Sequence, residues 1–303
     1  MIITCTLNPA IDYHLYQDQI IKGKLNRADN FQFDLGGKGI NVSKSLNQLA
    51  CRSRCITLLN SKYKFFYKPL IKKIGMANFD IVKTKALTRF NVKLHARQET
   101  EINTEFKGVT GCDLFKLRQK FKHVNDRDIL VFSGSSIKGE LYLYDSLVSS
   151  LKVKKADIVI DIPAEFYDQV LKYHPLLIKP NQDEINDYFG ITSEPESYID
   201  YCKQLIEKGV QNIILSLGKN GSILVTNDKA YQIILPEIKT NQAVGAGDAF
   251  VAGFVYDYQL NKDITKAYMF GHATSYAYLK NKNFNLEEVN QILEQIKIQE
   301  IIA

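Results

Sequence analysis

The chain of 303 residues is 45% hydrophobic and 24% charged, with a formal net charge of +6 at pH 7. These values are typical of a soluble globular protein that is large enough for a full hydrophobic core. No apolar run approaches the eighteen or so residues of a membrane-spanning helix. The positive net charge suits an anionic partner, but the basic residues are dispersed along the chain, which argues against a nucleic-acid-binding patch.

The five cysteines, at positions 5, 51, 55, 112 and 202, include no CxxC pair, and no histidine lies at zinc-ligand spacing from them. An odd number of scattered thiols is typical of reduced, mostly buried cysteines. The opening residues MIITCTLN read as a strand and carry no basic region before their apolar stretch. We therefore expect a cytoplasmic protein.

Short apolar runs of strand length alternate with helical patterns along most of the chain. Val42, Leu46, Leu49 and Ala50 recur at helical spacing after the first run. The runs occupy residues 2–7, 129–132, 158–160, 176–178 and 213–217. Apolar strands separated by helices are typical of a parallel sheet that is buried on both faces. The sequence thus predicts an α/β fold in which a central, mainly parallel sheet has helices on each side.

Two segments, 11–35 and 88–108, follow a different pattern. They contain period-2 alternation, as in NVKLHA at 91–96, where polar residues separate apolar ones. Half-exposed strands of this kind suit a small accessory sheet, so we expect both segments to form a lid. Residues 246–299 are almost entirely helical in pattern, and no linker or repeat interrupts the chain. We expect a single domain over residues 1–303 with this lid.

The segment AVGAGDAFVAGF at 243–254 carries the strongest chemical signal. Gly245, Ala246 and Gly247 directly precede a helical apolar pattern, and unobstructed backbone N–H groups at a helix start bind anions. Asp248 would lie beside that anion, where a carboxylate is unfavourable unless it has a task such as accepting a proton. A glycine-rich turn with an aspartate as helix cap is the alternative that spacing alone leaves open.

This dodecapeptide resembles the second signature of the ribokinase-like phosphofructokinase B (PfkB) family of carbohydrate kinases. Further segments resemble landmarks of the same family and follow in the family's order. They are TLNPAIDYHL at 6–15, GGKGINVSKSL at 36–46, TRFNVKL at 88–94 with TEIN at 100–103, SGSSIKG at 133–139, KPNQDE at 179–184 and SLGKNG at 216–221. The resemblance spans nearly the whole chain. It implies a three-layer α/β/α sandwich with a small β lid, and an ATP-dependent kinase.

The resemblance also implies a substrate site, which would hold a sugar phosphate through Asp12, Gly37, Lys38, Asn41 and Arg89. An ammonium group suits a phosphate as a point charge, an amide can bridge two sugar hydroxyls, and a guanidinium fork fits a phosphate with two hydrogen bonds. A solvated loop lysine, a surface strand arginine and a turn carboxylate are the plain alternatives for Lys38, Arg89 and Asp12.

The nucleotide side of the implied site falls on two further segments. Lys179 and Asn181 lie in KPNQDE, where Asn181 and Glu184 resemble the family's Asn-x-x-Glu motif; the Glu184 carboxylate would support Mg²⁺ largely through water. Acidic residues in the first turn of a helix are the alternative reading of Glu184. Ser216, Gly218 and Gly221 would form the turn that carries ATP, with glycines that permit close approach of the backbone.

These expectations describe an ATP- and Mg²⁺-dependent sugar-phosphate kinase with Asp248 as general base. TRFNVKL and TEIN are similar to segments of 1-phosphofructokinases, which favours fructose 1-phosphate as acceptor, and tagatose-6-phosphate kinases are the near alternative. A catalytically quiet sugar-phosphate sensor stays open because residues 272–285 lack the glycine expected near the adenine site. A dinucleotide-binding oxidoreductase is disfavoured, since neither glycine-rich segment completes GxGxxG. Half-exposed lid strands need cover, so a homodimer through the lids is a further hypothesis.

Overall fold

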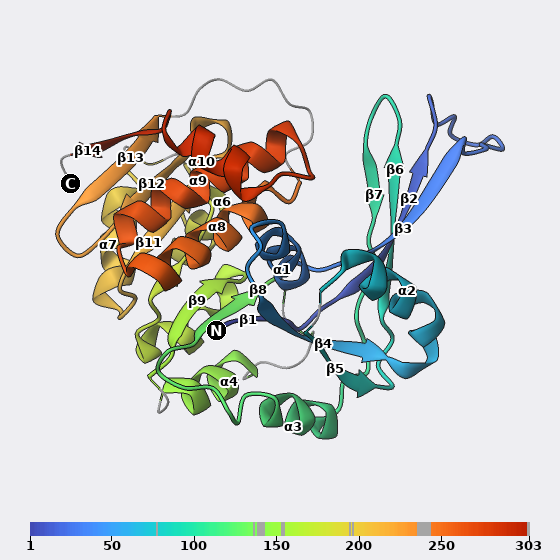
Figure 1. Cartoon of the computed structure of the whole chain (residues 1–303), viewed down its shortest axis with the longest axis horizontal. Coiled ribbons are helices and arrows are strands. Elements are labelled where there is room, and N and C mark those ends of the chain that lie inside the picture. Colours follow the sequence, from blue (N-terminus) through green and yellow to red (C-terminus); the bar gives the residue numbers. More distant parts are fainter. Residues whose placement is uncertain are drawn as a thin grey trace.

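The computed structural model describes residues 1–303 except 77, 136, 138–142, 153–154, 194, 196, 235–243 and 302–303. Its large sheet has ten strands in the order β14-β13-β12-β11-β10-β9-β8-β1-β4-β5 (Figure 1). In chain order these are β1 (Ile2–Thr6), β4 (Ser53–Asn60), β5 (Phe79–Thr84), β8 (Ile129–Ser133), β9 (Asp157–Asp161), β10 (Leu177–Ile178), β11 (Ile213–Ser216), β12 (Ser222–Val225), β13 (Ala230–Ile234) and β14 (Lys297–Ile301). The strands from β11 to β5 run parallel, and β12, β13 and β14 add an antiparallel end.

Helices cover both faces of the large sheet, with a separate hydrophobic core under each layer. One layer contains α1 (Lys38–Gln48), α8 (Ala246–Asn261), α9 (Ile264–Lys280) and α10 (Leu286–Leu293). The other contains α3 (Gly111–Gln119), α4 (Leu143–Lys152), α5 (Tyr167–Val170), α6 (Gln182–Phe189) and α7 (Ile199–Glu207). Short 3₁₀ turns join some elements: η1 (Ser61–Tyr63), η2 (Ala164–Phe166), η3 (Leu171–Tyr173) and η4 (Gly218–Asn220). The predicted three-layer α/β fold is confirmed.

A second sheet of four strands, here called the small sheet, stands away from the main body (Figure 1). It has the order β3-β2-β6-β7 and consists of β2 (Ala10–Tyr16), β3 (Asn30–Gly36), β6 (Arg89–His95) and β7 (Thr100–Ile102). All four strands come from the two segments with period-2 alternation. Helix α2 (Lys64–Ile74) packs against β3 at the base of the small sheet.

The alternation gives the small sheet one polar face and one apolar face, since successive side chains of a strand point to opposite sides. Asp12 of β2 pairs in register with Asn91 of β6, and Lys93 of β6 pairs with Glu101 of β7. The intervening residues, such as Tyr13 and Val92, belong to the other face.

Five strands of the large sheet, β1, β8, β9, β10 and β11, fall on the apolar runs that the sequence predicted, whereas β4, β5, β12, β13 and β14 do not. Residues 297–301 close the antiparallel end of the large sheet beside β13, and three of the five are exposed. An exposed edge strand lacks the apolar signal of a buried one, which is why the sequence pattern missed it. Among the described residues, no helix is long and apolar enough to cross a membrane.

His272 is buried on α9 where this helix crosses β12. Its Nε2 lies 2.7 Å from the Ser222 hydroxyl oxygen, and that hydroxyl also lies 3.0 Å from the Tyr268 hydroxyl. Burial lowers the pKa of His272 to about 3. The imidazole is therefore neutral in the folded protein at neutral pH, and its contact ties the helix layer to the sheet.

This lowered pKa makes folding stability depend on pH. Below about pH 6.5 the unfolded histidine binds a proton that the folded one does not, so stability falls as the pH falls, by up to about 1.4 kcal/mol per pH unit. Between pH 7 and pH 5, wild type should lose about 2 kcal/mol more unfolding free energy than His272→Gln. Urea unfolding of both proteins at the two pH values measures this difference, and parallel losses would contradict the prediction.

Candidate active site

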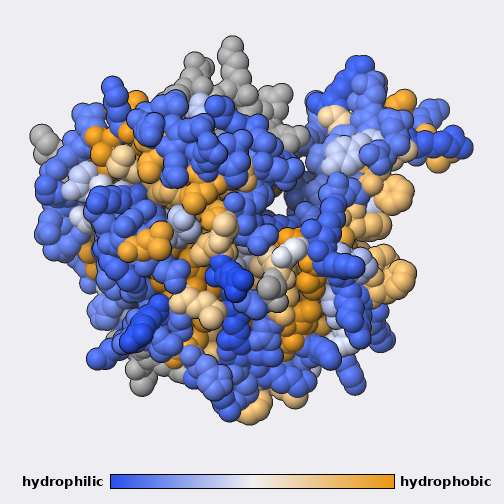
Figure 2. Space-filling view, in the orientation of Figure 1, coloured by the Kyte–Doolittle hydropathy of each residue, from blue (hydrophilic) through white to orange (hydrophobic). Residues whose placement is uncertain are grey.

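A cavity of about 490 Å³ lies between the main body and the polar face of the small sheet. Figure 2 shows the surface hollowed where the two parts meet. The walls of the cavity come from the ends of central strands, from the starts of α1 and α8, and from β2, β6 and β7. The lining residues are Asn8, Ala10, Asp12, Gly37, Lys38, Asn41, Arg89, Asn91, Lys93, Glu101, Asn103, Gly134, Ser135, Asp161, Pro163, Lys179, Glu184, Val244, Gly245, Gly247 and Asp248.

Asp248 lies in the first turn of α8 with its carboxylate in this cavity, and it is only 6% exposed. Its Oδ2 accepts a hydrogen bond of 2.8 Å from the side-chain amide of Asn41. The structure thus brings together two residues that the sequence assigned to one site. Burial, and next the negative charge of Asp161, raises the pKa of Asp248 to about 6. A carboxylate with such a pKa can accept a proton near neutral pH.

The start of α8 explains why the preceding residues are small. Gly245 is the N-cap with φ +93°, and a Cβ at this position would collide with the Tyr278 hydroxyl, which donates a hydrogen bond to the Val244 carbonyl. The next N–H groups, of Ala246, Gly247 and Asp248, have no partner within the helix. They form a place for an anion at the positive end of the helix dipole. Ala243, the first residue of the signature, lies outside the described residues.

Asp161, at the end of β9, holds two lysines from different parts of the chain. Its Oδ1 lies 3.2 Å from Nζ of Lys38 and 3.6 Å from Nζ of Lys179. Burial alone would raise the pKa of Asp161, but the charges of Lys179 and Lys38 outweigh it and hold this pKa below its ordinary value. Nζ of Lys179 also lies 3.6 Å from the place that a Cβ of Gly247 would occupy. Both ammonium groups are thus at the helix-start end of the cavity.

Glu184 and Asn181 form a capping box at the start of α6. The Asn181 side chain accepts from the Glu184 N–H at 2.8 Å, and the Glu184 carboxylate accepts from the Asn181 N–H at 2.9 Å. Burial raises the pKa of Glu184, which lines the cavity. Across the described ranges, no three His, Cys, Asp or Glu side chains form a metal-binding group. Because Mg²⁺ keeps several waters and needs one or two carboxylates beside phosphate oxygens, Glu184 fits this ion.

Of the residues predicted to carry the nucleotide, Lys179 lines the cavity, whereas Asn181, Ser216, Gly218 and Gly221 are not among the lining residues. Ser216 ends β11 and forms a parallel bridge with Asn181, which places the two segments side by side. Gly218 and Gly221 follow with φ +57° and +84°, conformations that favour glycine. Of the predicted SGSSIKG segment, residues 136, 138 and 139 lie outside the described residues.

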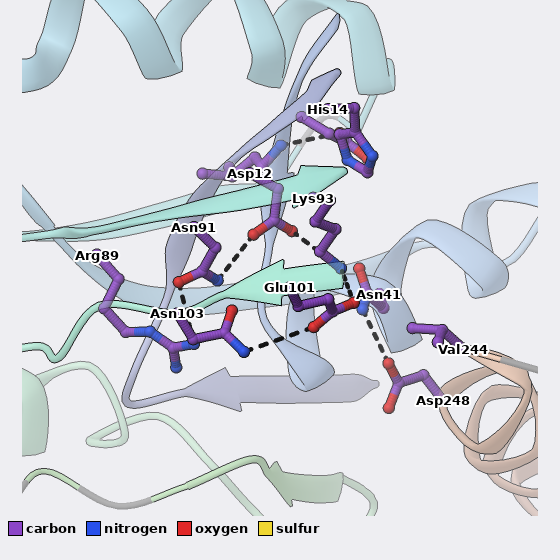
Figure 3. Close-up of polar contacts among 12 residues, drawn as sticks. Asp12, His14, Asn41, Arg89, Asn91, Lys93, Glu101, Asn103, Val244 and Asp248 are labelled. Atoms are coloured by element: carbon purple, nitrogen blue, oxygen red, sulfur yellow. Dashed lines mark hydrogen bonds and ion pairs between the residues drawn. The ribbon is translucent and has the colours of Figure 1, made fainter. Parts of the chain in front are cut away.

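The opposite end of the cavity is formed by the small sheet (Figure 3). Asp12 Oδ1 accepts a 2.9 Å hydrogen bond from Asn91, and Asp12 Oδ2 lies 3.9 Å from Nζ of Lys93. Nζ of Lys93 is also 3.5 Å from Glu101. Arg89 donates a 3.4 Å bond to Asn91, and its buried Nε has no hydrogen-bond partner among the described residues. Gly37 caps α1 nearby with φ +129°.

Sequence reasoning assigned no role to several of these residues. Asn91, Lys93 and Glu101 stand at polar positions of strands whose pattern was recognised, and that alternation was the signal for them. Asp161 gave a weaker signal, because a single aspartate after an apolar run is common at the end of a strand. Its partners, Lys38 and Lys179, are far from it in sequence, so only the fold brings them together.

Comparison with known proteins identifies the family of the chain. The model of the "pfkB family carbohydrate kinase" matches residues 5–288. The 1-phosphofructokinases of Borreliella burgdorferi and Bacillus subtilis are 33% and 31% identical to the chain, over 99% and 98% of it and 99% of each relative. The D-tagatose-1-phosphate kinase of Bacillus licheniformis is 25% identical over 98% of the chain and 99% of its own length.

The fold is likewise similar to that of a solved kinase. The structure of phosphofructokinase-2 from Escherichia coli in complex with fructose-6-phosphate has a TM-score of 0.89 and 22% identity, covering 97% of this chain and 98% of the other. At that identity the likeness concerns the fold alone. The family match over most of the chain and the relatives above 30% identity lead to one conclusion. The chain is a member of the pfkB family of carbohydrate kinases.

Proposed function

We propose that the protein is a 1-phosphofructokinase, which transfers the terminal phosphoryl group of ATP to the 6-hydroxyl of fructose 1-phosphate. The observation that carries this proposal is the buried Asp248 carboxylate beside the open start of α8, at one end of a cavity whose other end is lined by polar and charged side chains. The names of the two relatives above 30% identity support the choice of acceptor.

In the proposed reaction, Asp248 accepts the proton of the sugar 6-hydroxyl as its oxygen attacks the terminal phosphorus of ATP. A bond forms between that oxygen and the phosphorus, the bond from the phosphorus to the bridging oxygen breaks, and ADP leaves with the bonding electrons. The N–H groups of Ala246 and Gly247, with the ammonium groups of Lys38 and Lys179, stabilise the negative charge of the transferred group. Asn41 keeps the Asp248 carboxylate oriented.

Mg²⁺ bound with ATP would neutralise charge on the phosphates, and Glu184 is the residue that we expect to hold it, through water. The small sheet acts in this proposal as a lid. It covers the sugar and excludes water, which would otherwise compete with the hydroxyl for the phosphoryl group.

The cavity has two charged ends, which suit an acceptor with its phosphate and its reacting hydroxyl at opposite ends. Lys38 and Lys179 form ion pairs with Asp161 at the end of the cavity that contains Asp248. At the other end, the positive charge of Arg89 interacts with the carboxylate of Asp12 in the small sheet. We therefore assign the acceptor phosphate to the Arg89 end and Lys38 to the transferred group. A ketohexose 1-phosphate that reacts at its sixth carbon has this geometry.

Replacement of the proposed base tests the reaction. Asp248→Asn keeps the shape of the side chain but cannot accept the proton, so we expect kcat to fall by about 10² to 10⁴. The measurement is ATP consumption with Mg²⁺ and fructose 1-phosphate, with tagatose 6-phosphate and fructose 6-phosphate as alternative acceptors. Unchanged turnover in the variant would exclude Asp248 as the base, and binding of a sugar phosphate without turnover in wild type would favour a sensor.

The raised pKa of Asp248 predicts an acid limb in the rate profile. The base must be deprotonated, so kcat/KM should fall about tenfold per pH unit below about pH 6. Asp161→Asn removes the second cause of the raised pKa, after burial, and should move the midpoint of this limb to lower pH. A midpoint that stays in place in this variant would assign the limb to another group, such as the substrate phosphate.

We also propose that two copies of the chain associate through the apolar faces of their small sheets. Figure 2 shows apolar side chains on the side of the small sheet that faces away from the main body. Tyr13, Phe31 and Phe33 form a cluster of rings that continues to Phe66 of α2. Phe31 is 60% exposed, and burying such rings in a dimer would remove them from water.

Replacement of one exposed ring tests the dimer. Phe31→Asp should convert a dimer at micromolar concentration into a monomer, because a charge would have to be buried in the interface. Phe115→Asp on α3 is the matched control, since Phe115 is equally exposed and lies outside the small sheet. Light scattering gives the mass of each protein, and a monomeric wild type would exclude this association.

A further inference from the structure

Lys93 occupies a position in the cavity that the proposed reaction leaves without a role. It lies on the polar face of β6, four residues beyond Arg89, and its side chain is only 19% exposed. Nζ of Lys93 points between Asp12, at 3.9 Å, and Glu101, at 3.5 Å (Figure 3). The two carboxylates therefore hold the ammonium group of Lys93 inside the cavity, where it can contact a ligand.

The two carboxylates around Lys93 differ in their freedom to move. The Asp12 side chain is 12% exposed, and its other oxygen accepts a 2.9 Å hydrogen bond from Asn91. The Glu101 side chain is 41% exposed and comes from β7, the edge strand of the small sheet. It also accepts a 3.5 Å hydrogen bond from Asn103. Glu101 can therefore leave Lys93 at a lower cost than Asp12 can.

The charges at this end of the cavity balance, with Arg89 and Lys93 opposite Asp12 and Glu101. A dianionic phosphate placed among four such groups gains little, because each cation already has a carboxylate nearby. If Glu101 turns out toward solvent, one cation becomes available to the phosphate. Asp12 would then stay behind to accept hydrogen bonds from sugar hydroxyls.

We infer that Lys93 is a specificity-determining residue, which binds the phosphate already carried by the acceptor and exchanges Glu101 for it. The inference rests on the proposed function, since it needs an acceptor that enters with a phosphate. Arg89, whose Nε has no hydrogen-bond partner among the described residues, contacts the same phosphate from the other side. The exchange lets the site favour phosphorylated over unphosphorylated sugars, because only a phosphate replaces the lost ion pair.

Variants of Lys93 and Glu101 should have opposite effects. Lys93→Met removes a charged contact and should raise KM for fructose 1-phosphate roughly 10- to 100-fold, with kcat within about threefold and KM for ATP unchanged. Glu101→Gln removes the competing carboxylate and should lower that KM several-fold. Lys93→Arg keeps the charge and should retain most of the affinity. Lys107→Met is the matched control, an exposed lysine of the same chain segment that does not line the cavity.

A purely structural ion pair would behave differently, because breaking it from either side would weaken binding. A raised KM in both Lys93→Met and Glu101→Gln, or no change in Lys93→Met, would overturn the inference. Calorimetric titration of each protein with fructose 1-phosphate, tagatose 6-phosphate and fructose 6-phosphate, without ATP, measures the same effect apart from turnover. If wild type binds a sugar phosphate but consumes no ATP, the proposed kinase activity is contradicted. The affinities of the Lys93 and Glu101 variants for that sugar phosphate then support or overturn the inference about Lys93. Wild type that binds none would overturn both.

Discussion

The sharing of Asp161 between Lys38 and Lys179 is the interaction on which the site depends. Three carboxylates, of Asp161, Glu184 and Asp248, lie buried or partly buried in one cavity, and their mutual repulsion would favour protonation of all three. The two ammonium groups offset this repulsion at Asp161, whose pKa is held below its ordinary value. Burial, and next the negative charge that Asp161 keeps, raises the pKa of Asp248 to about 6, a value that suits a base near neutral pH. In the proposed reaction, the charge balance at Asp161 thus prepares Asp248 to act as the base.

The architecture delivers these groups to one place because parallel strands end at the same edge of the sheet. Asp161 ends β9, Lys179 directly follows β10, and Lys38 begins α1. The start of α8 adds backbone N–H groups and the positive end of a helix dipole to the same edge. Its N-cap, Gly245, has a backbone conformation that other residues rarely adopt, and Tyr278 occupies the space that a side chain would need. In the proposed reaction, backbone geometry and side-chain charges therefore act on the same anion.

Much of the fold could be predicted from the sequence because buried strands and amphipathic helices leave strong local patterns. The runs at β1, β8, β9 and β11 are continuous and apolar, whereas β14 is an exposed edge strand without such a pattern. The site was predicted where a motif combines several unusual residues, as around Asp248. Asp161 was missed because its partners Lys38 and Lys179 are separate from it in the chain, and the alternation that places Lys93 on the polar face does not show that its side chain lies between Asp12 and Glu101.

A single sequence pattern gives the small sheet the two faces to which we assign acceptor binding and association. Alternate residues of β2 and β6 place Asp12, Asn91 and Lys93 on the face toward the cavity and Tyr13 and Val92 on the other. A shift of one residue in the strand register would move the polar side chains to the apolar face and the apolar ones to the cavity. The same register therefore fixes both faces. If the apolar face is covered by a second copy, that contact restrains the strands that carry Lys93. Association and the affinity for the acceptor are then linked, and each must change the other by the same factor.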